Sequence, residues 1–204
     1  MKLTKFFKTI LISICFTVSF AIAGLSLTGC GDGNEPDKYA EIDKAINAAV
    51  EFLTNARDCG NYSSISEYYD GRVYEYYADD GKIKCVYNGT FYAVKEGGFD
   101  LYKISQDDDG TWHKNNDDTD LSDPEDRITK LIINVNRTFI WNDYDSKTKT
   151  LKCVASDGTI TLSLDDGVFT LAFNYTSGTT KHIINDVGTT TVTLPEDIID
   201  DTQD

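Results

Sequence analysis

The residues with the clearest chemical potential are Leu27-Thr28-Gly29-Cys30, which end an apolar run near the start of the chain. Lysines precede that run, and residues 9–27 contain no acidic side chain. A basic segment, an apolar segment and small residues before a cut site are the pattern of a secretory signal peptide. Cutting after Gly29 leaves Cys30, whose thiol is a nucleophile, at the new N-terminus.

This junction resembles the lipobox of bacterial lipoproteins. The resemblance implies that residues 1–29 are removed and that Cys30 carries a thioether-linked diacylglycerol. Each buried CH₂ contributes roughly 0.8 kcal/mol, so two acyl chains anchor a protein stably whereas one binds reversibly. The alternative is a transmembrane helix formed by the apolar run, which needs no such junction. We therefore expect a lipid-anchored protein at the extracytoplasmic face of a cell membrane, with the membrane as its partner through Cys30.

The charge balance limits the other partners. The chain has 34 acidic and 19 basic residues and a formal net charge of −15, and every acidic residue follows Gly29. An acidic surface repels nucleic acid and anionic lipid headgroups, so no nucleic-acid partner is expected. The acidity predicts solubility, with divalent-cation binding as the alternative. Residues 30–204 suffice for one domain with a core, and we expect a monomer.

The sequence contains no recognisable catalytic or metal-binding motif. Gly-x-Ser-x-Gly, His-Glu-x-x-His and Gly-rich phosphate loops are absent. His113 and His182 lie near no nucleophile motif. The acidic segment 106–120 departs from a calcium-binding EF-hand loop at Ser105 and Asn116, which leaves a weak calcium site as the alternative. We therefore expect no enzymatic activity, no cofactor and no metal.

The cysteines that follow Cys30 say little about the function. Cys59, Cys85 and Cys153 follow the lipidation site, and an odd number allows at most one disulfide. Cys85 and Cys153 lie in strand-like runs, where the role of a small buried apolar side chain is favoured. Without a Cys-x-x-Cys pair or a Cys/His cluster, no structural zinc site is expected.

Two amphipathic helices are predicted. In residues 38–57, apolar side chains recur at three- and four-residue steps and therefore share one face. The second helix covers residues 123–135, where Ser122 and Glu125 form a capping box. Each helix needs a surface against which its apolar face packs.

The remaining segments favour β-hairpins. Asp-Gly and Asn-Gly pairs, which supply the positive φ angles of tight turns, separate runs of alternating polar and apolar residues. Residues 106–120 are predicted to be a loop. The expected strands are 72–79, 82–87, 90–95, 99–105, 150–155, 159–164, 168–175, 180–186 and 190–194. This pattern predicts an α+β fold, mainly antiparallel β: a curved sheet or incomplete β-barrel covered by an N-terminal helix and one internal helix.

The order of these elements resembles the LolA-like lipoprotein-carrier superfamily, including LppX-type surface lipoproteins. The supporting pieces are Asn61-Tyr62-Ser63, Phe91-Tyr92-Ala93-Val94, Gly110-Thr111-Trp112 and Thr193-Leu194-Pro195-Glu196. The resemblance implies an incomplete barrel whose concave, helix-covered face holds acyl chains or another apolar ligand, with no catalytic residue. The domain then spans residues 38–195, between a tether (30–37) and an acidic tail (196–204). The periplasmic carriers lack a lipid anchor, so the anchor predicted here favours a fixed binder or sensor over a shuttle.

We therefore expect a membrane-anchored surface lipoprotein that binds a lipid or other apolar small molecule without catalysis. The alternative is a surface protein–protein interaction module with a fully packed core and no ligand cavity. The candidate cavity residues are apolar side chains of the second half of the chain, which would serve equally well as plain core: Leu131, Phe139, Trp141, Phe169, Leu171 and Phe173.

Overall fold

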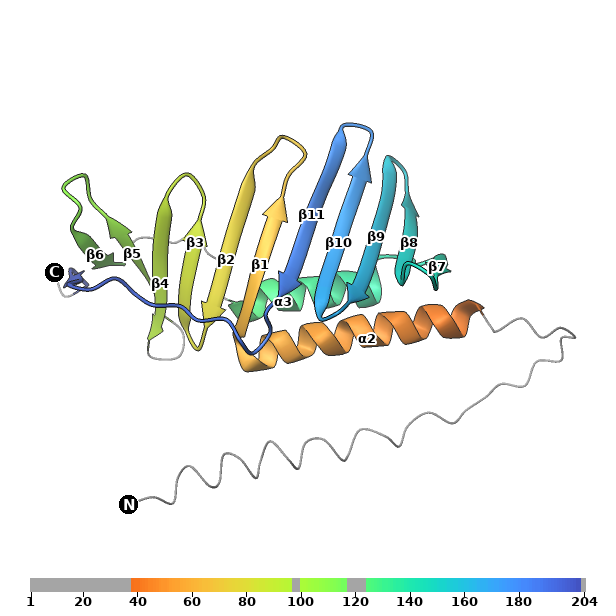
Figure 1. Ribbon diagram of the computed structural model, residues 1–204, viewed down its shortest axis with the longest axis horizontal. Coiled ribbons are helices and arrows are strands. Elements are labelled where there is room, and N and C mark those ends of the chain that lie inside the picture. Colours follow the sequence, from red (N-terminus) through yellow and green to blue (C-terminus); the bar gives the residue numbers. More distant parts are fainter. Residues whose placement is uncertain (1–37, 97–99, 117–123, 203–204) are drawn as a thin grey trace, which may run out of the picture. The chain divides into compact units, whose positions relative to one another are not determined.

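The computed structural model describes residues 38–96, 100–116 and 124–202 (Figure 1). The predicted signal peptide, the lipidation site Cys30, the tether and Ser122 of the capping box lie outside these residues. Among the helices that the structure describes, none has the length and apolar character needed to cross a membrane.

Within the described residues, twelve strands form one sheet. They are β1 (Asn61–Glu67), β2 (Val73–Asp79), β3 (Lys82–Val86), β4 (Thr90–Glu96), β5 (Asp100–Gln106), β6 (Trp112–Asn115), β7 (Asp143–Asp145), β8 (Thr150–Ala155), β9 (Gly158–Asp165), β10 (Val168–Tyr175), β11 (Gly178–Asn185) and β12 (Ile199–Asp200). Their order is β12-β6-β5-β4-β3-β2-β1-β11-β10-β9-β8-β7, so the sheet is open. Neighbours are antiparallel except β12 and β6, which are parallel. The predicted α+β, mainly antiparallel fold is confirmed.

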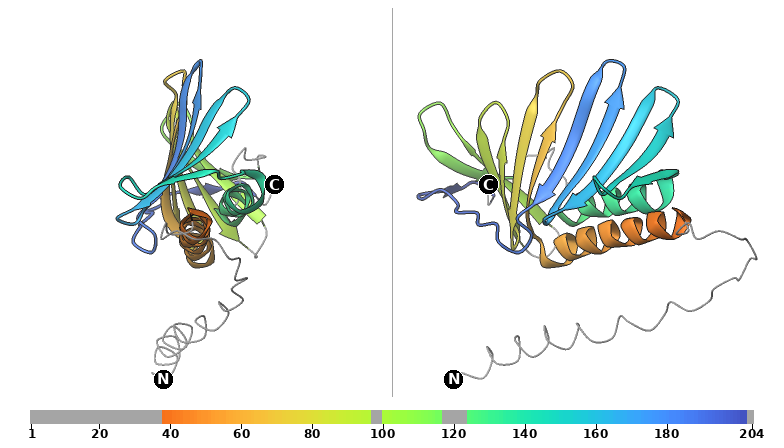
Figure 2. Two further views of the ribbon diagram at one scale, coloured as in Figure 1. Left: turned by 90° about the vertical axis from the view of Figure 1, so that its right-hand side faces the viewer. Right: turned by 45° about the vertical axis from the view of Figure 1, so that its right-hand side comes forward.

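Two α-helices accompany the sheet in the described residues: α2 (Lys38–Cys59) and α3 (Pro124–Ile133). The apolar stripe of α2 is buried, with Leu53 and Ala56 fully covered. A π-helix, η1 (Asn134–Thr138), continues α3 where the sequence predicted two more residues of α-helix. Figure 1 shows α2 and α3 side by side, and Figure 2 shows from two more directions how they lie against the sheet.

Both helices cover the same side of the sheet. Ser64 pairs with Ile184 and Ile184 pairs with Phe169, so these side chains point to one side. The ring of Phe169 is stacked with Phe52 of α2, with centroids 6.3 Å apart. Tyr62, two residues before Ser64, donates its hydroxyl to the carbonyl oxygen of Pro124 in α3 at 3.1 Å. We call this the helix-facing side; the core lies here.

The buried Tyr62 hydroxyl should stabilise the contact between β1 and α3. Changing Tyr62 to Phe removes a donor from the buried Pro124 carbonyl, and we expect the free energy of unfolding to fall by about 1–3 kcal/mol. Tyr77→Phe is the matched control, because Tyr77 is half-buried and donates to Glu75 at 2.7 Å. It should change stability by less than about 0.5 kcal/mol. Urea denaturation compares the variants, and equal losses would contradict the assignment.

The segment after β11 departs from the prediction. Residues 190–194, expected to be a strand, form no ladder, so that prediction is wrong. Side chains hold them instead: Thr190 N–H donates to Asn61 Oδ1 at 2.8 Å, and Val192 N–H donates to Asp79 Oδ2 at 3.0 Å. The segment thereby crosses the ends of β1 and β2 (Figure 1). Alternation alone could not distinguish this arrangement from a strand.

Three other strands lie where the sequence indicated none. β1 and β7 fall in unassigned segments, and β6 lies inside the predicted loop 106–120. The acidic tail supplies β12, whose Asp200 accepts a hydrogen bond from Lys114 of β6 at 3.0 Å. Hydrogen bonds from Thr202 and Lys114 lower the pKa of Asp200 to about 2. This pairing covers the outer edge of β6.

The burial of Cys85 and Cys153 matches the role predicted for them. Cys85 and Cys153 are buried, Cys59 is exposed, and these three cysteines are free. The small buried role predicted for Cys85 and Cys153 is confirmed.

Candidate ligand-binding site

Burial on the helix-facing side decreases along β10. In β10, Phe169 and Leu171 are fully buried, Phe173 is half-buried and Tyr175 is 38% exposed. The β1–β2, β3–β4 and β10–β11 turns all lie at the end of the sheet away from the helices (Figure 1). The hairpins therefore extend past the helices, and this part of the helix-facing side is only partly covered.

Aromatic rings occupy this partly covered part of the sheet. Tyr74 stacks on Tyr87 at a centroid distance of 3.8 Å and meets Tyr68 edge-on at 5.4 Å. The ring of His182 lies edge-on to Tyr68 at 6.3 Å and to Phe173 at 5.9 Å. Phe173 in turn contacts Phe139 at 5.9 Å. We call these six half-buried side chains the aromatic row: Tyr87, Tyr74, Tyr68, His182, Phe173 and Phe139.

The six cavity candidates from the sequence divide between this row and the core. Phe139 and Phe173 belong to the row, and Trp141 lies beside Phe139 with centroids 5.5 Å apart. Trp141 is itself buried, and its indole N–H donates to the carbonyl oxygen of Val135 at 2.8 Å. Phe169 and Leu171 are fully buried core residues, and Leu131 packs against the same core.

A polar cluster adjoins the row on the same side of the sheet. The Ser66 hydroxyl is hydrogen-bonded to Nδ1 of His182 at 2.9 Å. Arg127 of α3 donates from Nη2 to the hydroxyls of Ser64 and Ser66, each at 3.3 Å. Its guanidinium lies 4.9 Å from the centroid of the Tyr76 ring. We call Arg127, Ser64, Ser66, Tyr76 and His182 the Arg127 cluster.

The cluster suits recognition better than nucleophilic attack. A Ser–His pair is activated when a third group orients the histidine, and no carboxylate among the described residues is hydrogen-bonded to His182. Burial and the nearby charge of Arg127 lower the pKa of His182, so the ring is neutral at pH 7. Burial also raises the pKa of the Cys85 thiol to about 12, although the charge of Arg127 acts in the opposite direction. The groups around Arg127 are therefore uncharged donors and acceptors.

The lowered pKa of His182 predicts a pH dependence of stability. The unfolded chain, with a histidine pKa near 6.5, binds this proton more readily than the folded protein. His182 should therefore destabilise the fold progressively as the pH falls below about 6.5. The His182→Gln variant should lose less stability between pH 7 and pH 5 than the unmodified chain, measured by chemical denaturation.

His113 is the matched control, because its pKa shifts the other way. Hydrogen bonding to Asp201 and the charges of Asp107 and Asp201 raise its pKa. The stabilising contribution of His113 to the fold is present below about pH 6.5 and is lost as the pH rises through the raised pKa. His113→Gln should therefore lose more stability than the unmodified chain on acidification from pH 7 to pH 5. A shift of the same sign in both variants would contradict the assignments.

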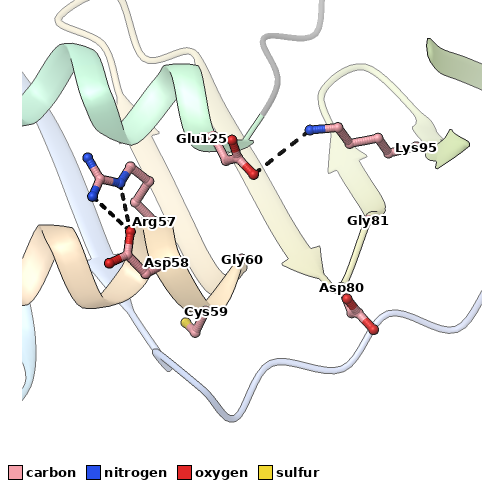
Figure 3. A pocket seen from close by; sticks show the side chains of 8 residues that line it. All are labelled: Arg57, Asp58, Cys59, Gly60, Asp80, Gly81, Lys95 and Glu125. Atoms are coloured by element: carbon pink, nitrogen blue, oxygen red, sulfur yellow. Dashed lines mark hydrogen bonds and ion pairs between the residues drawn. The ribbon is translucent and has the colours of Figure 1, made fainter. Parts of the chain in front are cut away.

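A separate pocket of about 370 Å³ opens at the end of α2 (Figure 3). It is lined by the last residues of α2, the β2–β3 turn, Lys95 of β4 and Glu125 of α3. Arg57 pairs with Asp58 at 2.8 Å, and Lys95 lies 3.9 Å from Glu125. None of the six cavity candidates lines this pocket. Its charged lining differs from the apolar cavity that the sequence predicts.

In the described part of the acidic loop, residues 106–116, two of the aspartates are engaged by neighbouring groups. Asp109 accepts a hydrogen bond from the backbone of Thr111 at 2.9 Å, and Asp107 lies 3.4 Å from His113. Across residues 38–96, 100–116 and 124–202, no three His, Cys, Asp or Glu side chains are grouped so that they could hold a metal ion.

Sequence reasoning missed most of the site. Tyr68 and Tyr74 flank the Asp70-Gly71 turn, and Tyr87 precedes Asn88-Gly89, so the predicted turns could have indicated that these rings share one end of the sheet. No local signal connects Arg127 with Ser66 and His182, because only the β1–β11 register brings the latter two together.

Comparison of the chain with protein-family models, with curated proteins and with solved structures finds no match.

Proposed function

We propose that this protein is a non-catalytic binder of a lipid or other apolar small molecule, held at the extracytoplasmic face of a cell membrane by lipid on Cys30. The observation that carries the proposal is the aromatic row, a continuous line of half-buried rings on the helix-facing side.

The row offers the type of surface that an apolar ligand needs. Burying apolar area contributes roughly 25 cal/mol per Å², and ring faces add geometric preference to that term. A contiguous apolar patch that stays partly exposed commonly marks a binding surface. Because Phe169 and Leu171 are fully buried, with Phe52 of α2 stacked on Phe169, the ligand is expected to lie over the half-buried Phe173 and the tyrosines.

The binding proposal is tested by native mass spectrometry of the protein as expressed from the full chain. We expect a fraction of the protein to carry a bound apolar molecule, which solvent extraction removes and a second spectrum then lacks. Spectra without bound mass, from repeated preparations, would contradict the proposal and favour the protein–protein interaction module.

The anchoring proposal has its own test. In Cys30→Ala the thiol that accepts the diacylglycerol is absent, so we expect the protein to leave the membrane fraction and its intact mass to lack the lipid. Cys59→Ala is the matched control, because Cys59 is exposed and free and its loss should change neither property. Unchanged mass and fractionation of Cys30→Ala would contradict the anchor.

A further inference from the structure

Arg127 is a cation held against buried neutral groups. It donates to Ser64 and Ser66, whose side chains belong to residues only 2% and 1% exposed. Its guanidinium also faces the ring of Tyr76, which is 2% exposed. Hydroxyl oxygens and a ring face solvate a guanidinium in part, but none of them carries a full negative charge.

No carboxylate within the described part of the chain neutralises this cation. None of the ion pairs identified between described residues includes Arg127. Arg57 and Arg72, by contrast, each pair with an aspartate. Among the described residues of this chain, whose net charge is −15, a half-buried arginine without a carboxylate partner is an exception, and it is costly unless an anion compensates it.

The cluster also lies next to the aromatic row. Ser66 is hydrogen-bonded to His182, and His182 contacts both Tyr68 and Phe173 of the row. The register agrees, because Ser66 pairs with Tyr74 on one side and with His182 on the other. A molecule lying along the rings therefore has the half-buried guanidinium of Arg127 at its side.

We propose that the apolar ligand ends in a carboxylate, as a fatty acid does, and that Arg127, positioned by its hydrogen bonds to the buried Ser64 and Ser66 hydroxyls, binds this carboxylate. The proposal rests on the proposed function, since it names the headgroup of the same ligand. A guanidinium matches a carboxylate with two parallel N–H···O bonds. The neutral His182 leaves the cluster with a single positive charge, which suits a single negative charge on the ligand.

The test compares two probes that differ only in their headgroup, decanoate and decanol, by equilibrium titration of the protein at pH 8. We expect the unmodified chain to bind decanoate at least about tenfold more tightly than decanol, a difference of roughly 1.4 kcal/mol. Arg127→Gln should lose this preference yet still bind decanol, which also reports that the variant is folded. Ser66→Ala should reduce the preference in part, because Arg127 then loses one of the two hydroxyls that position it.

Arg72 provides the discriminating control, because it lies 5.3 Å from the ring of Tyr68 but is paired with Asp70 at 2.7 Å. Arg72→Gln should keep the preference for decanoate. Equal binding of decanoate and decanol by the unmodified chain, or a preference that survives Arg127→Gln or disappears in Arg72→Gln, would overturn the headgroup assignment and leave the apolar binder standing. Binding of neither probe would overturn both proposals.

Discussion

Replacing Phe169 with alanine should lower the free energy of unfolding by about 3–5 kcal/mol, as expected for removing a large ring from a core that cannot collapse around the space. Phe169 is fully buried, and its ring is stacked with Phe52 across the sheet–helix interface. Chemical denaturation at neutral pH measures the loss. This residue was a cavity candidate from the sequence, and its burial indicates that its main contribution is to packing.

Phe173→Ala is the matched variant with which the stability loss of Phe169→Ala is compared. Phe173 projects from the same face of the same strand, four residues further along, but it is only half-buried. We expect its truncation to cost about 1–2 kcal/mol, with a larger effect on ligand binding than on folding. If the two variants were equally destabilised, the boundary between core and binding surface would not lie between these residues.

Gly158→Ala should be the second strongly destabilising change, by about 3 kcal/mol or more. A Cβ at this position would lie 2.0 Å from the carbonyl oxygen of Asn174, which belongs to the backbone of β10 and cannot rotate away. Gly158 pairs with Tyr175 across β9 and β10. The substitution must therefore displace the hairpin end that carries Phe173 and Tyr175. Thermal unfolding followed by circular dichroism measures the effect.

Gly167→Ala separates this clash from ordinary backbone strain. Gly167 lies in the β9–β10 turn with φ +74°, and a Cβ there would meet nothing within 4 Å. The strain of a left-handed conformation costs a non-glycine residue roughly 1–2 kcal/mol. If Gly158→Ala lost no more stability than Gly167→Ala, the backbone of β10 would have moved away from the new Cβ at little cost, and the prediction would be wrong.

Local chemistry explains why so much of the fold could be predicted. The Asp80-Gly81 and Asp166-Gly167 turns adopt the positive φ angles that the sequence implied, and the strands on either side begin and end within one or two residues of the prediction. The amphipathic stripe of α2 is buried as expected, because a regular apolar face has no other favourable partner in the chain.

The rest depended on contacts between distant segments. β1 joins the two halves of the sheet through Ser63, Ser64 and Ser66, whose hydroxyls gave no apolar alternation to recognise. β12 is only two residues long and exists because it pairs with β6. The Arg127 cluster could not be predicted either, because it also depends on a long-range contact. The register of β1 with β11 places Ser66 against His182.

The partition of the cavity candidates has a similar cause. Leu171 and Phe173 alternate along one strand and are indistinguishable by hydropathy. What separates them is how far other parts of the fold cover each side chain, and the sequence of β10 alone does not contain this information. Sequence reasoning could therefore identify the apolar face but not the point at which packing ends and the partly covered surface begins.

The most direct test of the central claim is the affinity for decanol, an apolar probe without charge, measured by titration of three proteins. The unmodified chain should bind it, Phe173→Ala should bind it about tenfold more weakly because a ring of the aromatic row is gone, and Tyr77→Ala should match the unmodified chain. Tyr77 belongs to the opposite side of β2 from Tyr76 and so serves as the control. Equal affinities in all three proteins, or no binding by the unmodified chain, would contradict the account.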